Sequence, residues 1–599
     1  MIVIYWWFIL FLFNLPALAL GQRLFKDLPD RGYALIKVLG LAIVSYSIWL
    51  LSSLHLLAFT QINILVVFLG LSFINVLLIK KEKFFSKIII FEELLFFVGL
   101  AGWSYVRMYK PEIFGLEKFT DFALVNTAFR SNFMPPLDPW LAGHTVNYYY
   151  FGQFVTAMLA KFSNIGLGTV YNLMIATLFG LTFSGAFSIV YNLTKKIRAG
   201  ILAGLLLTLG GNLHTIYAFS DWSKYWYPSA VRFIPFTITE FPAYSFVVAD
   251  LHAHLLDIPF VLLIITFVLT FKPKMLNFLT LGVVLAMMLM TNSLDAPIYA
   301  GLLFLVLLPK YRLMSIIYTL IPVILMYILS LPFILNFTPF VSGIRLNNIA
   351  HSPIEMFLIL WGFPLLIFGI YFVKTPKNWF VTAGILLVLG LIVFPEIAYF
   401  KDIYPTYFRA NTMFKLGYQA FIIFSLLAPY IIFNCKKRLV FLPFLFLIFL
   451  YPLFSLPSNY GFKYNKPTTL DGLAYMQPED LAIVNWLNKN VLGQPVIVEA
   501  VGESYSNYAR FSTNTGLPTI LGWPGHEWGW HLGPEILGTR REDVRQIYES
   551  ADPALLSKYK VEYIIVASLE RKDYKINEEK FSKNFKLIFQ TGTSKIYKL

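Results

Sequence analysis

The run GTVYNLMIATLFGLTFSGAFSIVYNLTKKIR at residues 168–198 joins a long apolar stretch to a cluster of basic residues. An apolar stretch of about 20 residues spans the core of a bilayer when it is helical. Basic residues are enriched in the loops on the cytoplasmic side of a membrane. The run therefore predicts a transmembrane helix that ends on the cytoplasmic side.

The composition extends this prediction to most of the chain. Hydrophobic residues make up 58% of the 599 residues, and charged residues only 14%. A soluble core cannot hide so large an apolar share, so we expect an α-helical polytopic membrane protein. The net charge of +15 does not indicate nucleic-acid binding, because Lys and Arg stand in short clusters between the apolar runs.

Apolar runs of similar length recur along the chain and predict about fourteen transmembrane helices. We expect these helices at residues 2–20, 34–54, 61–79, 88–108, 168–190, 199–217, 252–271, 276–291, 296–309, 313–335, 354–373, 378–398, 416–434 and 439–456. The first run lacks a basic segment before it and a clear cleavage site, so we interpret it as a helix and not as a signal peptide.

The basic residues provide a test of this topology. They cluster at residues 23–31, 80–87, 195–198, 272–274, 310–312, 374–377 and 436–438. All of these clusters fall in alternate loops, as expected of the cytoplasmic side. The alternation holds only if residues 148–163 do not cross the membrane, so we expect an amphipathic helix there on the outer surface.

The sequence changes character after Leu456, where apolar runs shorten and charges become common. Alternating patterns predict strands at 495–500, 563–568, 586–590 and 594–599, with helices at 478–490 and 541–559. We therefore expect a transmembrane domain at 1–456 and an extracytoplasmic α/β domain at 457–599. The single cysteine, Cys435, excludes an intrachain disulfide.

The first outer loop, residues 109–167, contains the sequence EKFTDFA around Asp121. A carboxylate at the membrane surface can act as a general base or bind a metal ion. The structural alternative is that Asp121 caps a helix at 122–130, since Asp is a favoured N-cap residue. Asp138, in the sequence LDPW, is interpreted as a turn residue.

Three consecutive tyrosines, Tyr148, Tyr149 and Tyr150, follow in the same loop. Aromatic faces stack on sugar rings and on the isoprene units of lipids. An aromatic belt at the membrane interface accounts for the same residues without any ligand. The triplet alone leaves both explanations open.

The second outer loop, residues 218–251, leads into EFPAYSFVVADLHAHLLD, which places Glu240, Asp250, His252 and His254 close together in sequence. On a helix the two histidines would diverge, whereas Asp250 and His254 would share a face. Such a pair can bind a phosphate or a metal ion, or it can be purely structural.

Two basic residues, Arg409 and Lys415, lie on the predicted outer side, where the charge bias disfavours them. Basic groups at the level of the lipid headgroups are suited to hold a phosphate or diphosphate. Snorkelling of long side chains at helix ends is the alternative.

Several of these sequences together resemble a known family. EKFTDFA (117–123), DPWLAGHTVNYYYFGQ (138–153), FPAYSFVVADLHAH (241–254), FRANTMFK (408–415) and LGWPGHEW (521–528) resemble the uncharacterised "YYY" multi-pass membrane proteins. More broadly, an acidic residue in the first outer loop, followed by PPL and a surface aromatic helix, resembles the GT-C class of integral-membrane glycosyltransferases.

The GT-C resemblance implies an inverting enzyme that transfers a sugar from a polyprenyl-phosphate donor to an acceptor at the outer face of the plasma membrane. It implies catalytic roles for Asp121, as the base, and Asp250. We expect Arg409, Lys415, His252 and His254 at the donor phosphate. We expect the sugar or the acceptor to contact Tyr148, Tyr149, Tyr150, Glu240, Trp523, His526 and Glu527, with Glu499, Tyr505, Arg510 and Trp530 of the tail around them.

The chain also departs from the better-known GT-C members. Asp121 is followed by Phe122 rather than by a second carboxylate, and the sequence WWDYG is absent. No set of ligands has a convincing metal-binding spacing, so a need for Mg²⁺ or Mn²⁺ stays open. The acceptor can be a glycan, a lipid or a protein.

A polytopic transporter or lipid flippase is the alternative function. Transporters tend to show internal repeats and ionisable groups near the bilayer midplane. In this sequence we find no repeat, and the polar residues gather on one face of the membrane. This distribution favours chemistry at the surface.

Overall fold

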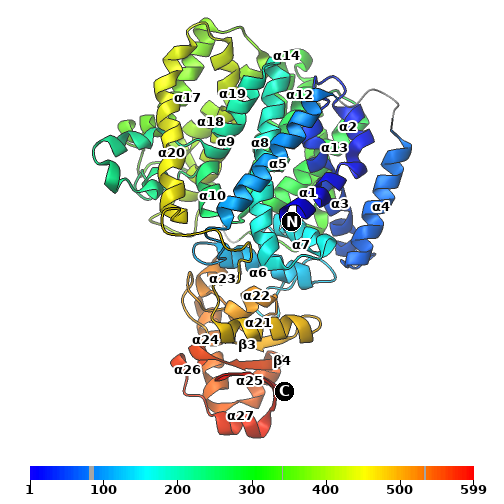
Figure 1. Cartoon of the computed structure of the whole chain (residues 1–599), viewed down its shortest axis with the longest axis vertical. Coiled ribbons are helices and arrows are strands. Elements are labelled where there is room, and N and C mark those ends of the chain that lie inside the picture. The colour runs from blue at the N-terminus through cyan, green and yellow to red at the C-terminus, as the bar shows by residue number, and fades with distance from the viewer. Residues whose placement is uncertain (80–85, 340–341, 532–533) are drawn as a thin grey trace.

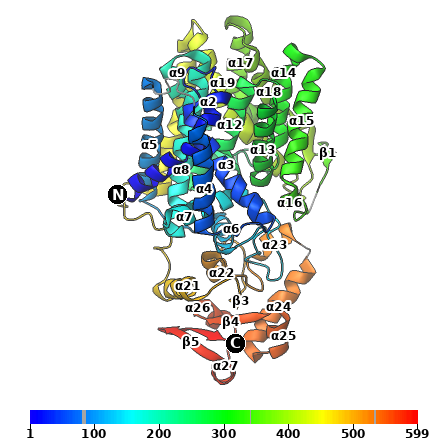
Figure 2. The ribbon, with the colours of Figure 1, turned by 90° about the vertical axis from the view of Figure 1, so that its right-hand side faces the viewer.

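The computed structural model describes residues 1–79, 86–339, 342–531 and 534–599, and helices dominate it (Figure 1). Two parts follow one another along the longest axis. A bundle of long helices forms the larger part, and the C-terminal residues form a smaller part that contains a β-sheet. Figure 2 shows the same order from the side, with the sheet at the end remote from most of the bundle.

The long helices of the bundle come from residues up to 460. They are α1 (Ile2–Leu12), α2 (Leu18–Leu24), α3 (Tyr33–Ser53), α4 (Gln61–Leu77), α5 (Lys87–Arg107), α8 (Leu167–Thr194), α9 (Ile197–Leu209), α12 (Ile258–Thr270), α13 (Met275–Thr291), α14 (Asp295–Tyr311), α15 (Met314–Leu329) with the short α16 (Leu331–Ile334), α17 (Ile354–Lys374), α18 (Trp379–Ile397), α19 (Ala410–Asn434) and α20 (Leu442–Tyr460). A two-stranded antiparallel pair, β1 (Ile344–Leu346) with β2 (Ala398–Phe400), joins two of the loops.

Burial separates central helices from peripheral ones. The apolar windows of α8 and α19 are 94% buried, whereas those of α5 and α20 are only 33% and 28% buried. Apolar side chains that the peripheral helices leave exposed need an apolar solvent, which a bilayer supplies. The exposed apolar surface therefore supports insertion of the bundle in a membrane.

Within the described ranges, eight helical segments are long and apolar enough to cross a membrane, and a bent pair, α9 with the 3-10 segment Leu213–Phe219, makes up to nine. Four further apolar helices, α4, α12, α13 and α15, are shorter. Each of the predicted ranges overlaps an apolar helix. The protein is thus a multi-pass membrane protein by length and composition of its helices, and the number of fourteen spans stays a prediction.

Several of the basic loops meet at one end of the bundle. Lys272 forms an ion pair with Asp27, and the Lys196 ammonium donates to Asn434 Oδ1 at 3.1 Å. The tail joins the opposite end, where Asn172 donates to the carbonyl of Leu470 at 2.9 Å. Most of the basic cluster at 80–87 lies outside the described residues. The grouping of these loops agrees with the predicted alternation, and the side that faces the cytoplasm stays a prediction.

Four short helices close the tail end of the bundle: α6 (Lys118–Arg130), α7 (Phe151–Ser163), α10 (Pro242–Val248) and α11 (Ala253–Leu256). The prediction of an amphipathic helix on the membrane surface at 148–163 was wrong, because α7 is buried from Phe151 to Ala160 and packs against α6, α8 and α4. Its polar groups find partners inside the protein: Gln153 contacts Asp121, and Lys161 donates to the carbonyl of Phe59.

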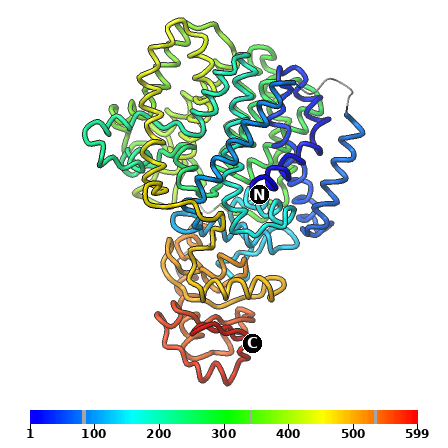
Figure 3. The backbone as a smooth tube through the Cα atoms, viewed as in Figure 1, coloured from blue at the N-terminus to red at the C-terminus, as the bar shows by residue number. Residues whose placement is uncertain are grey.

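The tail begins where α20 ends. Figure 3 follows this yellow segment into the orange helices of the tail. The tail contains α21 (Pro478–Asn490), α22 (Arg510–Thr515), α23 (Pro524–Trp530), α24 (Pro534–Ser550), α25 (Pro553–Lys558), α26 (Ser568–Asp573) and α27 (Glu578–Asn584), and the strands β3 (Val496–Val498), β4 (Val561–Val566), β5 (Lys586–Thr591) and β6 (Ser594–Lys598).

The four strands form one sheet in the order β3-β4-β6-β5, with β3 parallel to β4 and the other pairs antiparallel. Each strand overlaps one of the four ranges that the alternating pattern predicted, although β4 begins two residues before its range and β5 ends one residue after its range. The single helix predicted at 541–559 is interrupted, because Ala551 adopts a φ of 51° and Asp552 caps a new helix that has Pro553 in its first turn.

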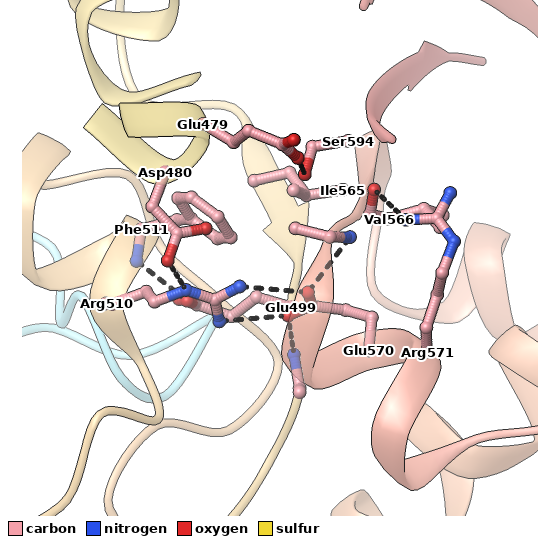
Figure 4. Close-up of polar contacts among 12 residues, drawn as sticks. Glu479, Asp480, Glu499, Arg510, Phe511, Ile565, Val566, Glu570, Arg571 and Ser594 are labelled. Carbon is pink, nitrogen blue, oxygen red and sulfur yellow. Dashed lines mark hydrogen bonds and ion pairs between the residues drawn. The ribbon is translucent and has the colours of Figure 1, made fainter. Parts of the chain in front are cut away.

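A buried ionic network stabilises the tail (Figure 4). The Arg510 guanidinium, 4% exposed, lies 2.8 Å from Asp480 and 3.1 Å from Glu570. Glu499 is fully buried and accepts the backbone N–H groups of Phe511 and Ser512, both at 2.8 Å. Glu499 and Arg510 thus hold the tail together, and the prediction that they line an acceptor groove was wrong.

Helix α6 connects the bundle to the tail. Arg130, its last residue, donates to the carbonyls of Thr515 at 2.6 Å, Val491 at 2.8 Å and Gly493 at 3.0 Å, and to the side chain of Asn488 at 3.0 Å. A planar guanidinium suits several acceptors held in fixed positions. The tail is therefore anchored to the helix that carries Asp121.

Candidate functional site

The candidate site lies where the bundle meets the tail, and Asp121 is at its centre. Asp121 occupies the first turn of α6, whose N-cap is Glu117, so the interpretation of Asp121 as a helix cap was wrong. Its side chain is fully buried, and Oδ1 lies 3.2 Å from His252 Nδ1 and 3.4 Å from Gln153 Nε2. Oδ2 is buried without a hydrogen-bond partner among the described residues. Burial raises the pKa of the Asp121 carboxyl, and the charge of His252 offsets this rise only in part.

His252 connects this buried carboxylate to the solvent. It is the N-cap of α11 and has an extended backbone, with φ −82° and ψ 160°. Its side chain is 20% exposed, and its Nε2 lies 3.2 Å from the Tyr148 hydroxyl. Burial lowers the pKa of the imidazole, but the charge and hydrogen bond of Asp121 outweigh it and raise the pKa to about 9. His252 is therefore a cation at neutral pH.

The segment around His252 is not one continuous helix. Helix α10 ends at Ala249, which has a φ of 58°, and α11 starts only at Ala253. The expected pairing of Asp250 with His254 was wrong for this reason. His254 instead lies 3.0 Å from Ser245 Oγ, and burial together with the charge of His252 lowers its pKa well below the usual value. His254 is neutral and packed among aromatic rings, so it is poorly suited to hold a phosphate.

Asp250 faces a lysine that sequence reasoning missed. The Lys118 ammonium lies 3.8 Å from Asp250 Oδ1, and both side chains are mostly buried. Burial raises the pKa of Asp250 to about 7 and lowers the pKa of Lys118 to about 8. Both groups can exchange a proton near neutral pH, which suits acid–base chemistry.

Glu117, which was also missed, links the site to the tail. Its carboxylate accepts the Tyr505 hydroxyl at 2.7 Å and lies 2.8 Å from His526 Nε2. Burial raises the pKa of Glu117, but the hydrogen bond and charge of His526 outweigh burial and lower it to about 2. The spacing of four between Glu117 and Asp121, one helical turn, was the signal in the sequence that could have identified it.

Aromatic rings from the loop and the tail form a wall over these charges. Tyr148 stacks on Trp530 with centroids 5.0 Å apart, Trp140 lies 5.1 Å from Trp523, and His526 lies 5.2 Å from Trp523. The predicted residues Tyr148, Trp523 and His526 thus come together, although they are far apart in the sequence.

The other two tyrosines of the triplet point elsewhere. Tyr149 accepts a hydrogen bond from the Lys415 ammonium at 3.0 Å, and its ring lies 4.5 Å from that of Tyr148. Tyr150 is buried and accepts the indole N–H of Trp49 at 3.2 Å. Lys415 therefore belongs to the site through Tyr149, whereas Tyr150 has a structural role.

Arg409 does not lie free beside Lys415. Its guanidinium is 3% exposed, lies 2.9 Å from Glu396 and donates to Ser352 Oγ at 3.4 Å. Within the described ranges, its contacts join it to α18 and the loop before α17 rather than to Asp121. The expected convergence of Arg409 with Asp121 on one hollow was wrong, because Glu396 already neutralises this arginine.

Glu240 lies at the edge of a cavity within the bundle. It forms an ion pair with Arg232 at 2.9 Å. The pocket is narrow and is lined by Glu240, Asn212, Trp361, Leu391, Met413 and Phe421, among others. Its apolar lining suits a hydrocarbon chain better than a sugar.

One group of side chains has the donors of a metal site: Asp138, Glu527 and His531, whose ligand atoms all lie within 4.8 Å of one another. Asp138 is a turn residue as predicted, because its Oδ1 accepts the N–H groups of Trp140 and Leu141. Glu527 is fully buried, so the expectation that it contacts the acceptor was wrong.

The sequence was compared with known proteins. The profile of a family described as "Uncharacterized membrane protein (DUF2298)" matches residues 43–386 and 374–424. The matched segments include Asp121, the tyrosine triplet, His252 and Lys415, whereas the tail lies beyond them. A search of curated proteins gave no match. Since the profile covers more than half of the chain, the protein belongs to this family of membrane proteins.

Proposed function

We propose that the protein is an inverting integral-membrane glycosyltransferase of the GT-C type. It transfers a sugar from a polyprenyl-phosphate donor to an acceptor hydroxyl at the outer face of the plasma membrane. The observation that carries this proposal is the Asp121–His252 pair, which lies beneath an aromatic wall at the end of a membrane bundle.

The pair divides the acid–base work between its members. Asp121 is fully buried, so it positions and charges His252, and it is His252 that contacts the substrate. The carboxylate fixes the imidazole through Nδ1, so a substrate oxygen would have to replace the Tyr148 hydroxyl, 3.2 Å from Nε2, to accept the proton of the cationic ring. Because His252 already carries a proton at neutral pH, Asp250, whose pKa burial raises to about 7, is the group that takes the acceptor proton.

The donor lipid would use the cationic and apolar parts of the site. His252 and Lys415 supply positive charge, which stabilises a developing lipid phosphate. The pocket beside Glu240 has a mostly apolar lining, which isoprene units could contact if the surrounding side chains moved apart. Arg409 could join them only if its ion pair with Glu396 opened.

The acceptor would approach from the tail. Tyr148 and Trp530 are only partly buried and present rings on which a sugar can stack, whereas Trp140 and Trp523 are buried behind them; Glu117 is 30% exposed nearby. Solvent reaches the cluster through Glu117 and His252. These two residues mark the entrance to the reacting groups.

The test is transfer from a radiolabelled polyprenyl-phosphate sugar by membranes that contain the protein. Asp121→Asn and His252→Gln should each reduce transfer at least a hundredfold, a typical effect of losing acid–base catalysis. Asp221→Asn, on an exposed turn, is the matched control and should be fully active. Undiminished transfer by both site variants would refute the proposal.

A transporter or lipid flippase is the second candidate, and one observation favours it. Lys37 of α3 forms an ion pair with Glu93 of α5 at 2.9 Å, and the neighbouring Glu92 is buried with neither oxygen bonded among the described residues. Ionisable groups inside membrane helices often mark a transport path. Substrate counter-flow in proteoliposomes without any sugar transfer would favour this function.

A further inference from the structure

The cluster of Asp138, Glu527 and His531 lies beside the proposed transferase site and has no role in it. Asp138 comes from the first loop, whereas Glu527 and His531 come from α23 and its C-cap in the tail. Glu527 and His531 are four residues apart, so they share one face of the helix. The cluster thus joins two segments almost 400 residues apart in the sequence.

The three donor atoms are close to the positions that a metal ion requires. His531 Nε2 lies 2.9 Å from Asp138 Oδ2 and 3.8 Å from Glu527 Oε2. Ligands about 2.1 Å from a tetrahedral ion lie roughly 3.4 Å apart, so small side-chain rotations would complete the geometry. Asp138 is held in place for this role, because its other oxygen accepts two backbone N–H groups.

The state of Glu527 points independently to a missing ligand. Its side chain is fully buried, and neither carboxylate oxygen has a hydrogen-bond partner within the described part of the chain. The nearby Arg540 does not fill this role, because its guanidinium donates to the carbonyls of Ala142 and Ile520. A buried carboxylate without a partner is costly unless a proton or a cation accompanies it.

We propose that Asp138, Glu527 and His531 bind a divalent transition-metal ion, with Zn²⁺ as the best match. One imidazole nitrogen and two carboxylate oxygens are typical zinc ligands, and a pure oxygen set would be expected for Mg²⁺ or Ca²⁺. The His144 ring, 5.2 Å from that of His531, lies near enough to fill a fourth position after a rotation.

The bound ion would lock α23 against the first loop. Helix α23 also carries His526, which contacts Glu117, and Trp530, which covers Tyr148. Fixing this helix would therefore fix the aromatic wall over Asp121. The ion has a structural role, and its binding does not depend on whether the protein transfers a sugar.

The experiment measures metal content and stability of the full-length chain in detergent. The protein is stripped with EDTA, dialysed against Zn²⁺, Mn²⁺ or Mg²⁺ in parallel, and analysed by mass spectrometry of the elements. We expect one Zn²⁺ per chain and a Tm that rises with the logarithm of free Zn²⁺. Wild-type protein that retains no Zn²⁺, or that prefers Mg²⁺, would overturn the proposal.

Two variants identify the ligands. Glu527→Gln preserves size but removes the anionic oxygens, so bound Zn²⁺ and the Zn²⁺-dependent rise in Tm should both be lost. Its metal-free Tm should equal or exceed that of the wild type, because an unpartnered buried carboxylate is gone. His531→Gln should likewise lose bound Zn²⁺ and the Zn²⁺-dependent rise in Tm, but its metal-free Tm should not rise, because the buried Glu527 carboxylate stays in place. Glu503→Gln, at an 85% exposed side chain of the tail, is the control that should bind normally. Normal Zn²⁺ binding by both ligand variants would refute the assignment.

Discussion

Asp121 makes the largest of the contributions that keep His252 charged, ahead of Glu117 and Asp250, which makes Asp121→Asn a direct test of the site. Asp121 and its hydrogen bond outweigh the effect of burial and raise the pKa of His252 from 6.5 to about 9. This difference corresponds to about 3 kcal/mol between the two protonation states. Once Asn replaces the carboxylate, the negative charge of Asp121 no longer offsets the effect of burial, which disfavours the charged form of His252. We expect the pKa of His252 to return to its ordinary value of 6.5 or fall below it.

The sign of the stability effect follows from the raised pKa. The stabilisation from charged His252 is fully present below pH 6.5 and is lost as the pH rises through about 9. The wild type should therefore lose stability between these two values. Asp121→Asn should lack this alkaline dependence.

Diethyl pyrocarbonate provides the assay, because it modifies histidine only when the imidazole is neutral. His252 is accessible enough to react, and mass spectrometry of its peptide gives the extent of reaction at each pH. The midpoint should lie near pH 9 in the wild type and at or below 6.5 in Asp121→Asn. The exposed His351 should show the same profile in both proteins. A wild-type midpoint near 6.5, or one that Asp121→Asn leaves unchanged, would refute the reasoning.

Three further predictions concern the tail and its attachment. Arg510→Ala should lower the free energy of unfolding by about 3 to 5 kcal/mol in denaturant titrations, because it leaves two buried carboxylates without their partner. Arg545→Ala, on an exposed face, is the control and should leave the unfolding midpoint unchanged. Equal effects of the two variants would contradict the buried network. The pKa of Glu117 is lowered from 4.5 to about 2, so the stabilisation from its contact with His526 should be fully present above pH 4.5, decrease progressively below it, and be lost as the pH falls through about 2. Thermal melts from pH 3 to 7 with Glu117→Gln as reference test this, and a benefit that disappears completely by pH 4 would argue against it. Arg130→Ala should speed chymotrypsin cleavage of the tail severalfold, because four acceptors lose their donor; an unchanged rate would show that other contacts hold the tail.

The elements were predictable where a periodic pattern decides the structure. The apolar runs gave helices, and the alternation at 563–568 and 594–599 gave neighbouring strands, because both signals depend on local residues. The pattern failed at 148–163, since a buried helix with a few polar side chains has the same composition as one on a membrane surface. Whether Gln153 faces water or Asp121 is decided by tertiary contacts.

The candidate site was predictable in its residue types but not in its pairs. Asp121 and His252 are 131 residues apart, and Asp138 and His531 are 393 apart, so no spacing in the sequence reveals either contact. The ion pair of Arg409 with Glu396, which lies near the end of α18, was not predictable from the sequence. The break at Ala249 changed the directions in which Asp250 and His254 point. It could not be predicted from the sequence, because alanine rarely adopts a left-handed conformation.

Helix α6 is fixed near both ends, by the contacts of Asp121 in the candidate site and by the contacts of Arg130 with the tail. Its first turn holds Asp121, and its last residue, Arg130, contacts the tail about 14 Å farther along the helix. A helix held at both ends transmits a rotation of one end to the other. A partner that binds the tail and rotates it would therefore turn α6 about its axis and change the position of Asp121 relative to His252. A displacement of the tail would thus reach Asp121 through α6, without any ligand entering the bilayer.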